Sequence, residues 1–143
     1  MSELRAIVYV SSATEALTAP QLERLLTAAR KVNLENSVTG VLLYSDGNFM
    51  QYLEGTDEAV SLTFSRIQAS KKHRSIIEIL NQRIAQRSFP NWEMGFAQPT
   101  KSELLALSTA RWQTIERDEP GASPSSSGLA LLRGFWQRAR RYF

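Results

Sequence analysis

Gln51 is a primary amide inside the apolar run 48–55, a position where it could relay hydrogen bonds within a core. Alternation along a strand would put Gln51 on the same face as Phe49 and Leu53, which should both face a core. A buried amide without a partner costs roughly 1–3 kcal/mol. We therefore expect Gln51 to have a polar partner there, and that partner is either protein or a ligand.

Tyr9, Asn33 and Arg66 are the other polar side chains that this pattern brings toward Gln51. Taken singly, Tyr9 is typical of a buried aromatic, Asn33 of a helix C-cap and Arg66 of a solvated charge. Together with Gln51 they supply one phenol, two amides and one guanidinium. A flat heteroaromatic ring with carbonyls and ring nitrogens on one edge would pair with all of them. The apolar walls of such a slot would be Ile7, Leu25, Phe49 and Ile67.

The elements that must position these side chains follow the order β-α-β-β-α-β-β. A helix begins at Thr18, a hydroxyl cap followed by Pro and Gln, and the polar break 33–37 ends it. Asp46 and Gly47 predict a hairpin because this pair suits positive φ. The expected strands are 5–11, 38–44, 48–54, 75–84 and a short 92–96, with the second helix starting at Thr56 or Asp57.

This order predicts an α+β protein with the ferredoxin-like arrangement, two helices lying on one face of the sheet. The first and third strands are the central pair of that fold. Tyr9 and Gln51 can therefore approach each other on the helix-facing side, and Asn33 and Arg66 come from the two helices above it.

The sequence pattern changes after residue 97. We expect a domain over 1–97, followed by a helical extension over 98–143. Helices are expected at 101–114 and 129–142, joined by a flexible linker around 116–128 that is rich in Ser, Pro and Gly. The last helix carries an apolar stripe that needs a cover, either the back of the sheet or another chain. Its residues are Leu132, Phe135, Trp136 and Ala139.

Composition removes several classes of function. The chain has no cysteine, which excludes disulfides, thiolate metal sites, Cys nucleophiles and cysteinyl-flavin photochemistry, and His73 is its only histidine. The net charge of +3 comes from the end of the chain: residues 128–143 hold four arginines and no acid, so the rest is nearly neutral and nucleic-acid binding is not favoured. No apolar run approaches a membrane span and no signal peptide is visible, so a cytoplasmic protein is expected.

Over residues 4–97 the sequence resembles the BLUF family, the blue-light sensors using flavin. The resemblance is carried by the runs 7–12, 36–44, 48–55 and 89–94, together with Asn33, Arg66, Ile67 and His73. It implies a five-stranded ferredoxin-like variant that holds a noncovalent flavin between its two helices. The implied cofactor is FAD, with FMN or riboflavin as alternatives.

The resemblance also implies roles for residues at matching positions. Tyr9 and Gln51 would be the photoactive pair, and Trp92 and Met94 would be the fifth-strand residues that exchange places near Gln51. Asn33 and Arg66 would hold the polar edge of the flavin, Ser11 would lie near the photoactive pair, and His73 would have a minor role. Two positions depart from the family: Ser70 stands where many members have an acid, and Val32 where several have a polar or aromatic residue.

The mechanism so implied is a reversible switch and not a catalytic cycle. Light would drive an electron and then a proton from Tyr9 through Gln51, whose amide would return rotated or as its tautomer. The changed hydrogen bonds should shift flavin absorption to the red. We expect the signal to leave through a downstream protein partner or a change in a homo-oligomer, with the fifth strand and the C-terminal helices as the responding elements.

Three other functions compete with this one. An acylphosphatase-like hydrolase shares the element order, but it needs a glycine-containing anion loop where this chain has Ser-Ser-Ala-Thr at 11–14. A flavin-dependent redox enzyme needs a second substrate site or a nicotinamide motif, and neither is visible. An RNA-binding module of related fold would need aromatics such as Tyr44 and Tyr52 exposed on the sheet, together with basic flanks.

Overall fold

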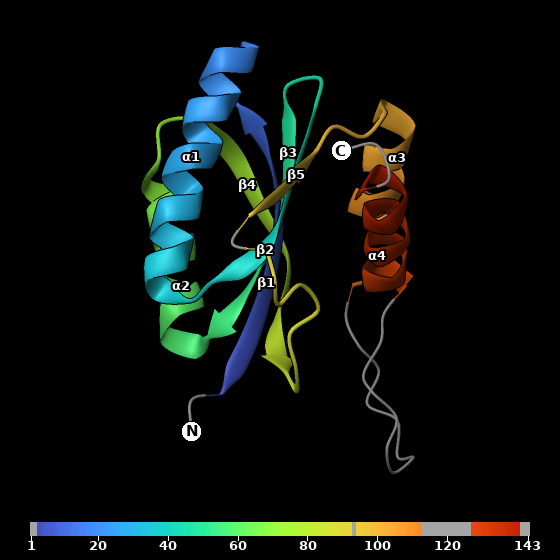
Figure 1. Cartoon of the computed structure of the whole chain (residues 1–143). Coiled ribbons are helices and arrows are strands. Elements are labelled where there is room, and N and C mark those ends of the chain that lie inside the picture. The colour runs from blue at the N-terminus through green and yellow to red at the C-terminus, as the bar shows by residue number, and fades with distance from the viewer. Residues whose placement is uncertain (1–2, 93, 113–126, 141–143) are drawn as a thin grey trace.

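The structure is a computed structural model that describes residues 3–92, 94–112 and 127–140 in three layers (Figure 1). Helices α1 and α2 cover one face of a five-stranded sheet, and α3 and α4 cover the other. The elements are β1 (Leu4–Ala13), α1 (Ala19–Asn36), β2 (Thr39–Ser45), β3 (Asn48–Thr56), α2 (Asp57–Ala69), β4 (His73–Ile84), β5 (Gly95–Ala97), α3 (Lys101–Thr109) and α4 (Ser127–Arg140).

The strand order β4-β1-β3-β2-β5 confirms the predicted α+β ferredoxin-like arrangement. β1 runs antiparallel to both β3 and β4, and β5 joins the edge of the sheet parallel to β2. Asp46 and Gly47 adopt positive φ angles of 49° and 80° and make the predicted hairpin between β2 and β3. The register that follows places Tyr9 directly opposite Gln51 on the two central strands.

The first helix ends inside the polar break 33–37, but at the far end of that break and not at Asn33. α1 continues to Asn36, and Ser37 is the left-handed C-cap, with φ of 56° and its N–H bonded to the carbonyls of Asn33 and Leu34. Asn36 is the last helical residue, and its side-chain amide donates to the Val32 carbonyl at 2.8 Å. Asn33 is therefore a residue of the helix and not its cap.

Other boundaries shift in the segments with the least periodicity. The fifth strand is limited to Gly95–Ala97, because the chain before it turns back with the Trp92 N–H donating to the Phe89 carbonyl at 3.2 Å. α3 ends at Thr109, since Ala110 is extended, and not at residue 114. Residues 113–126 and 141–143 lie outside the described part, and with them most of the expected linker 116–128 and the last two residues of the predicted final helix. α4 begins at Ser127, inside the expected linker.

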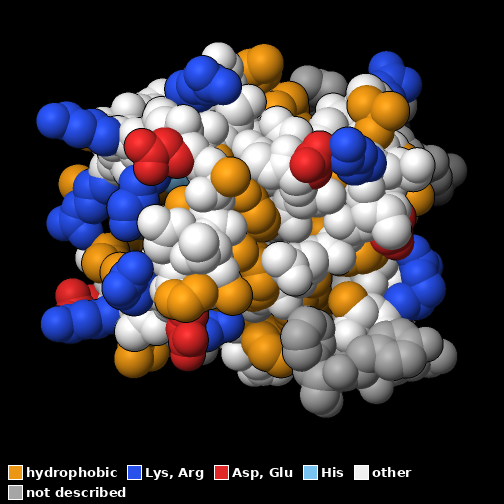
Figure 2. Space-filling model, turned by 90° about the horizontal axis from the view of Figure 1, so that it is seen from above, with side chains coloured by type: hydrophobic (Ala, Val, Ile, Leu, Met, Phe, Trp, Pro, Cys, Tyr) orange, Lys and Arg blue, Asp and Glu red, His pale blue; other side chains and the backbone are white. Residues whose placement is uncertain are grey.

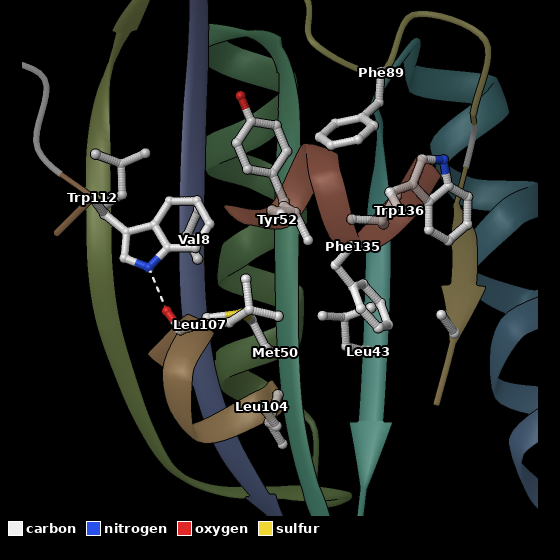
Figure 3. Close-up of a cluster of buried hydrophobic side chains, with 14 of the residues drawn as sticks. Val8, Leu43, Met50, Tyr52, Phe89, Leu104, Leu107, Trp112, Phe135 and Trp136 are labelled. Atoms are coloured by element: carbon white, nitrogen blue, oxygen red, sulfur yellow. Dashed lines mark hydrogen bonds between the residues drawn. The ribbon is translucent and has the colours of Figure 1, made fainter. Parts of the chain in front are cut away.

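Each face of the sheet has its own core. The helix-side core contains Ile7, Phe49 and Leu53, and the back core contains Val8, Met50 and Tyr52, as alternation along β1 and β3 requires. α3 and α4 close the back core, where Phe135 and Trp136 pack over the strands and the Trp112 indole N–H donates to the Leu107 carbonyl at 2.8 Å (Figure 3). The apolar stripe of α4 is thus covered by the back of the sheet.

Gly95 of β5 lies directly against Trp136 of α4. A Cβ at this position would lie 2.5 Å from the ring carbons of Trp136, too close for the indole to stay in place. We expect Gly95→Ala to lower the free energy of unfolding by roughly 1–3 kcal/mol through overpacking. Urea denaturation followed by circular dichroism measures this change.

Gly134 supplies the matched control on α4. A Cβ there meets only the Arg138 guanidinium, at 3.5 Å, and Ala is the better helix former, so Gly134→Ala should stabilise the protein by roughly 0.5–1 kcal/mol. Equal stability of the two variants would contradict the close packing of Trp136 on β5.

Candidate functional site

Tyr9 and Gln51 form a hydrogen-bonded pair at the centre of the sheet. The Tyr9 hydroxyl donates to Gln51 Oε1, and both side chains are buried, with 0% and 5% of their surface exposed. Burial raises the pKa of Tyr9 well above its ordinary range, so the phenol keeps its proton and acts as the donor. The amide oxygen of Gln51 is thereby engaged, and its NH₂ group must point the other way.

The NH₂ group of Gln51 meets Met94. Gln51 Nε2 lies 3.3 Å from Met94 Sδ, in a contact that is fully buried. A thioether sulfur is only a weak acceptor. The amide therefore makes a strong hydrogen bond through its oxygen and a weak one through its nitrogen. An amide held in this asymmetric way can reorient at less cost than one with strong partners on both sides.

A cavity of about 270 Å³ opens beside this pair, between α1, α2 and the sheet. It brings together most of the side chains that the sequence singled out, and His73 and Ser70 border it too. The residues that line it are Tyr9, Leu25, Ala28, Ala29, Val32, Asn33, Leu42, Gln51, Thr63, Arg66, Ile67, Ser70 and His73. Viewed from one end of the sheet, Lys and Arg side chains gather on the side of the molecule formed by α1 and α2 (Figure 2).

Five of the singled-out residues lie outside this lining: Met94, whose contact with Gln51 is described above, and four others. Ile7 and Phe49 are in the helix-side core beneath the cavity, with at most 1% of their surface exposed. Ser11 is turned toward His73, with 2.9 Å between Oγ and Nδ1. Trp92 packs against the back core, edge-on to Trp136 with the ring centroids 5.3 Å apart, so the sheet separates it from Gln51.

His73 borders the cavity where β4 begins. Its ring lies edge-on to Tyr9, with centroids 6.0 Å apart, and 4.7 Å from the ring of Phe49. Burial, and then the neighbouring Lys72, lower the pKa of His73. The imidazole is therefore neutral at pH 7, and it presents one donor and one acceptor to Ser11 and the cavity.

Several functional positions escaped the sequence reasoning. Ala28 and Ala29 make room for the cavity because they are small, and Leu42 faces it by alternation along β2; both signals were readable. Thr63 also lines it, although its hydroxyl is engaged with the Ala59 carbonyl at 2.8 Å. No pattern in the sequence indicated the structural role of Glu54.

Glu54 fastens the segment that leads into β5. Its carboxylate is fully buried and accepts hydrogen bonds from the Ser88 N–H at 2.7 Å, the Phe89 N–H at 2.6 Å and the Thr39 hydroxyl at 3.2 Å. Burial raises the pKa of Glu54, against the opposing effect of these donors. Phe89 in turn packs edge-on against Tyr52, so the path from β3 to residue 92 is tightly held (Figure 3).

The lining of the cavity is that of a small-molecule site. Its walls are mostly apolar, with amide, hydroxyl and guanidinium groups at a few points, the pattern of sites for small ligands and cofactors. Among the described residues no group of three His, Asp or Glu could hold a metal ion. Within the same ranges no helix is both long and apolar enough to span a membrane.

Comparisons with known proteins agree with this geometry. Residues 4–95 match the family model for sensors of blue light using FAD. The chain is 30% identical over 106 residues to photoactivated adenylate cyclase subunit beta of Euglena longa, which covers 73% of this chain and 12% of that protein. It is 29% identical over 86 residues to the blue light- and temperature-regulated antirepressor BluF of Escherichia coli, covering 60% of this chain and 21% of that one.

A solved structure is also similar. The dark-state structure of BlrB, a BLUF protein, superposes with a TM-score of 0.66 and 32% sequence identity, covering 76% of this chain and 80% of that one. The chain spans only about an eighth to a fifth of the length of the two sequence relatives, so what those proteins do as wholes does not transfer to it directly.

Proposed function

The chain belongs to the BLUF family, the sensors of blue light using FAD, and from that premise we propose that Tyr9 and Gln51 are its light-switched pair. Family membership makes it a flavin-binding photosensor. The observation that supports the residue assignment is the Tyr9–Gln51 hydrogen bond, which lies at the wall of a cavity between two helices. Residues 1–97 form the sensor domain in this proposal, and 98–143 its C-terminal extension.

The residues that line the cavity fit the ring of a flavin. We propose that Asn33 and Arg66 hold its polar edge and that Leu25 and Ile67 pack on its faces. Ile7 and Phe49 pack beneath the site, and the hydrogen bond between Ser11 and His73 lies on its β4 side. A volume of about 270 Å³ is near the lower end of ligand sites, so FAD would place its ring inside and the rest of the dinucleotide outside.

When bound, flavin supplies a chromophore that blue light converts into a strong oxidant. Tyr9 is the electron donor in this proposal, and its hydroxyl proton moves along the existing hydrogen bond to Gln51 Oε1. The electron from Tyr9 and a proton from the Gln51 nitrogen would pass to the bound flavin, while the amide oxygen takes the Tyr9 proton. The amide would then be its imidic tautomer, in which donor and acceptor sides are exchanged. Return of the electron and the proton to Tyr9, and of a proton to the Gln51 nitrogen, would restore the starting state, so no covalent bond to the cofactor is required.

The output is proposed to pass through β5. Met94 contacts Gln51, and the next residue, Gly95, lies beneath Trp136 of α4, so a change at the amide has a short route to the C-terminal helices. The two sequence relatives carry different outputs in their names, a cyclase and an antirepressor. We propose that this chain is not itself an enzyme and that it signals to a protein partner or through a homo-oligomer; a cytoplasmic location stays a prediction of the sequence.

The absorption spectrum before and after blue light tests this function. We expect purified protein to carry FAD and to show a red shift of the flavin band under blue light, with full recovery in the dark. A colourless protein that does not bind added FAD would favour the rival functions. Of those, RNA binding has little support from the structure, because Tyr44 and Tyr52 are buried, with 7% and 2% of their surface exposed.

A further inference from the structure

Arg30 of α1 reaches across to the segment that carries Met94. Its Nε–H donates to the Met94 carbonyl at 3.0 Å. This is the same residue whose sulfur lies 3.3 Å from Gln51 Nε2. Main chain and side chain of Met94 are therefore held by two different elements, the helix and the central strand.

The position of Arg30 on α1 ties this contact to the cavity. Ala29, Val32 and Asn33 line the cavity from the same stretch of helix. The helix wall of the ligand site and the start of β5 are thus joined by one side chain. Any movement of α1 against the sheet must either carry the Met94 carbonyl with it or break the bond.

A second hydrogen bond fixes the same segment from the sheet. The Gly40 N–H of β2 donates to the Trp92 carbonyl at 2.8 Å. With both carbonyls held, Met94 faces the helix-side core and Trp92 faces the back core, against Trp136. Bringing Trp92 to the helix side would require this segment to slide or twist, and such a motion displaces the Met94 carbonyl.

We infer that Arg30 is a positioning residue that keeps Met94, and not Trp92, beside the photoactive amide. The inference deepens the proposed function and rests on it for the role of Gln51. The bond is charge-assisted and only partly buried, and Arg30 is an exposed residue, so solvent moderates its strength. It therefore biases which of Met94 and Trp92 lies beside Gln51 without locking either arrangement, as a light-switched segment requires.

Methionine methyl NMR in the dark tests this inference. The chain has three methionines, so protein labelled with [¹³C-methyl]methionine gives few signals, and Met94→Leu assigns the one of interest. We compare Arg30→Leu with Arg24→Leu, which removes the same charge from an exposed position of the same helix. The FAD-bound full chain is used throughout, and Arg30→Lys is a milder third variant.

We expect Arg30→Leu to shift or split the Met94 signal, with the minor arrangement raised about fivefold, and to change the dark recovery rate by a similar factor. Arg24→Leu should match the wild type, and Arg30→Lys should lie between the two. Identical Met94 signals and recovery rates in Arg30→Leu and Arg24→Leu would overturn the inference. So would loss of FAD from Arg30→Leu alone, because Arg30 would then be a residue of the ligand site.

Different results would contradict the proposed function and the role of Arg30. The NMR comparison is made in the dark, so it does not depend on photochemistry. Absence of a light-induced red shift in the wild-type protein would count against the proposed function alone. A normal photocycle with an unmoved Met94 signal in Arg30→Leu would count against the role of Arg30 alone.

Discussion

Gln51→Leu should abolish the light-induced red shift while the protein keeps its flavin and its fold. Leu has nearly the same volume as Gln and is compatible with the buried position beside Phe49 and Leu53. It can neither accept the Tyr9 hydroxyl nor change donor and acceptor sides, so the relay has no middle member. Absorption spectra of the FAD-bound variant before and during blue light measure the effect, and we expect no shift beyond the noise.

Two further variants bracket this result. Tyr9→Phe removes only the hydroxyl that donates to Gln51 and should give the same loss of the photocycle. Met94→Leu removes only the weak thioether contact, so we expect it to keep the red shift and alter its lifetime. A full red shift in Gln51→Leu would refute the role assigned to the amide, whatever the behaviour of Met94→Leu.

Glu54→Ala should be the most destabilising single truncation among the polar residues, by roughly 3–5 kcal/mol. The change leaves the Ser88 and Phe89 N–H groups buried without an acceptor and opens a void behind them. An unsatisfied buried donor costs roughly 1–3 kcal/mol, and a cavity adds to that cost. Chemical denaturation of the wild type and the variant under the same conditions measures the difference.

Glu54→Gln is the matched control, because it keeps the shape and one acceptor oxygen. We expect it to cost less than Glu54→Ala, since one of the two backbone donors keeps its partner. A loss below about 1 kcal/mol for Glu54→Ala, less than the lower estimate for even one orphaned donor, would contradict the anchoring role of this carboxylate.

The pH dependence of stability follows from the raised pKa of Glu54. The folded state holds the proton to a higher pH than the unfolded chain does, so the contribution of Glu54 is complete below its unfolded pKa and declines as pH rises through the raised folded value. The difference in stability between wild type and Glu54→Gln isolates this effect, because His73 titrates in both. That difference should shrink as pH rises through this window.

The positions of Tyr9 and Gln51 were predictable from sequence because two strong local signals agree. The Asp46–Gly47 turn sets the hairpin register, and the alternation of β1 and β3 sets the faces. The end of α1 was not predictable in the same way. Polar residues usually mark a helix end, but here Asn33 is polar because of the cavity it faces and not because the helix stops.

The segment around β5 shows the limit of pattern reading. Alternation says which face a residue takes only within a strand, and Trp92 precedes the three residues that form one. Its orientation is decided by Trp136, which is 44 residues away and comes from the other face of the sheet. The hydrogen bond from Arg30 to the Met94 carbonyl could not be predicted either. Every residue has a main-chain carbonyl, so the sequence does not indicate which one accepts from Arg30.

The two separate cores on either side of one sheet have a consequence for how such a protein diversifies. Substitutions in α3 and α4 affect the chromophore side only through the sheet. The back core, one compartment, can therefore change in sequence while the helix-side core, the other compartment, keeps its chemistry. The residues just before β5 are the exception, since Met94 belongs to one compartment and Trp92 to the other. A substitution at Met94 or Trp92 must therefore be compatible with both cores at once. A new output domain would come under light control only if it contacts this segment.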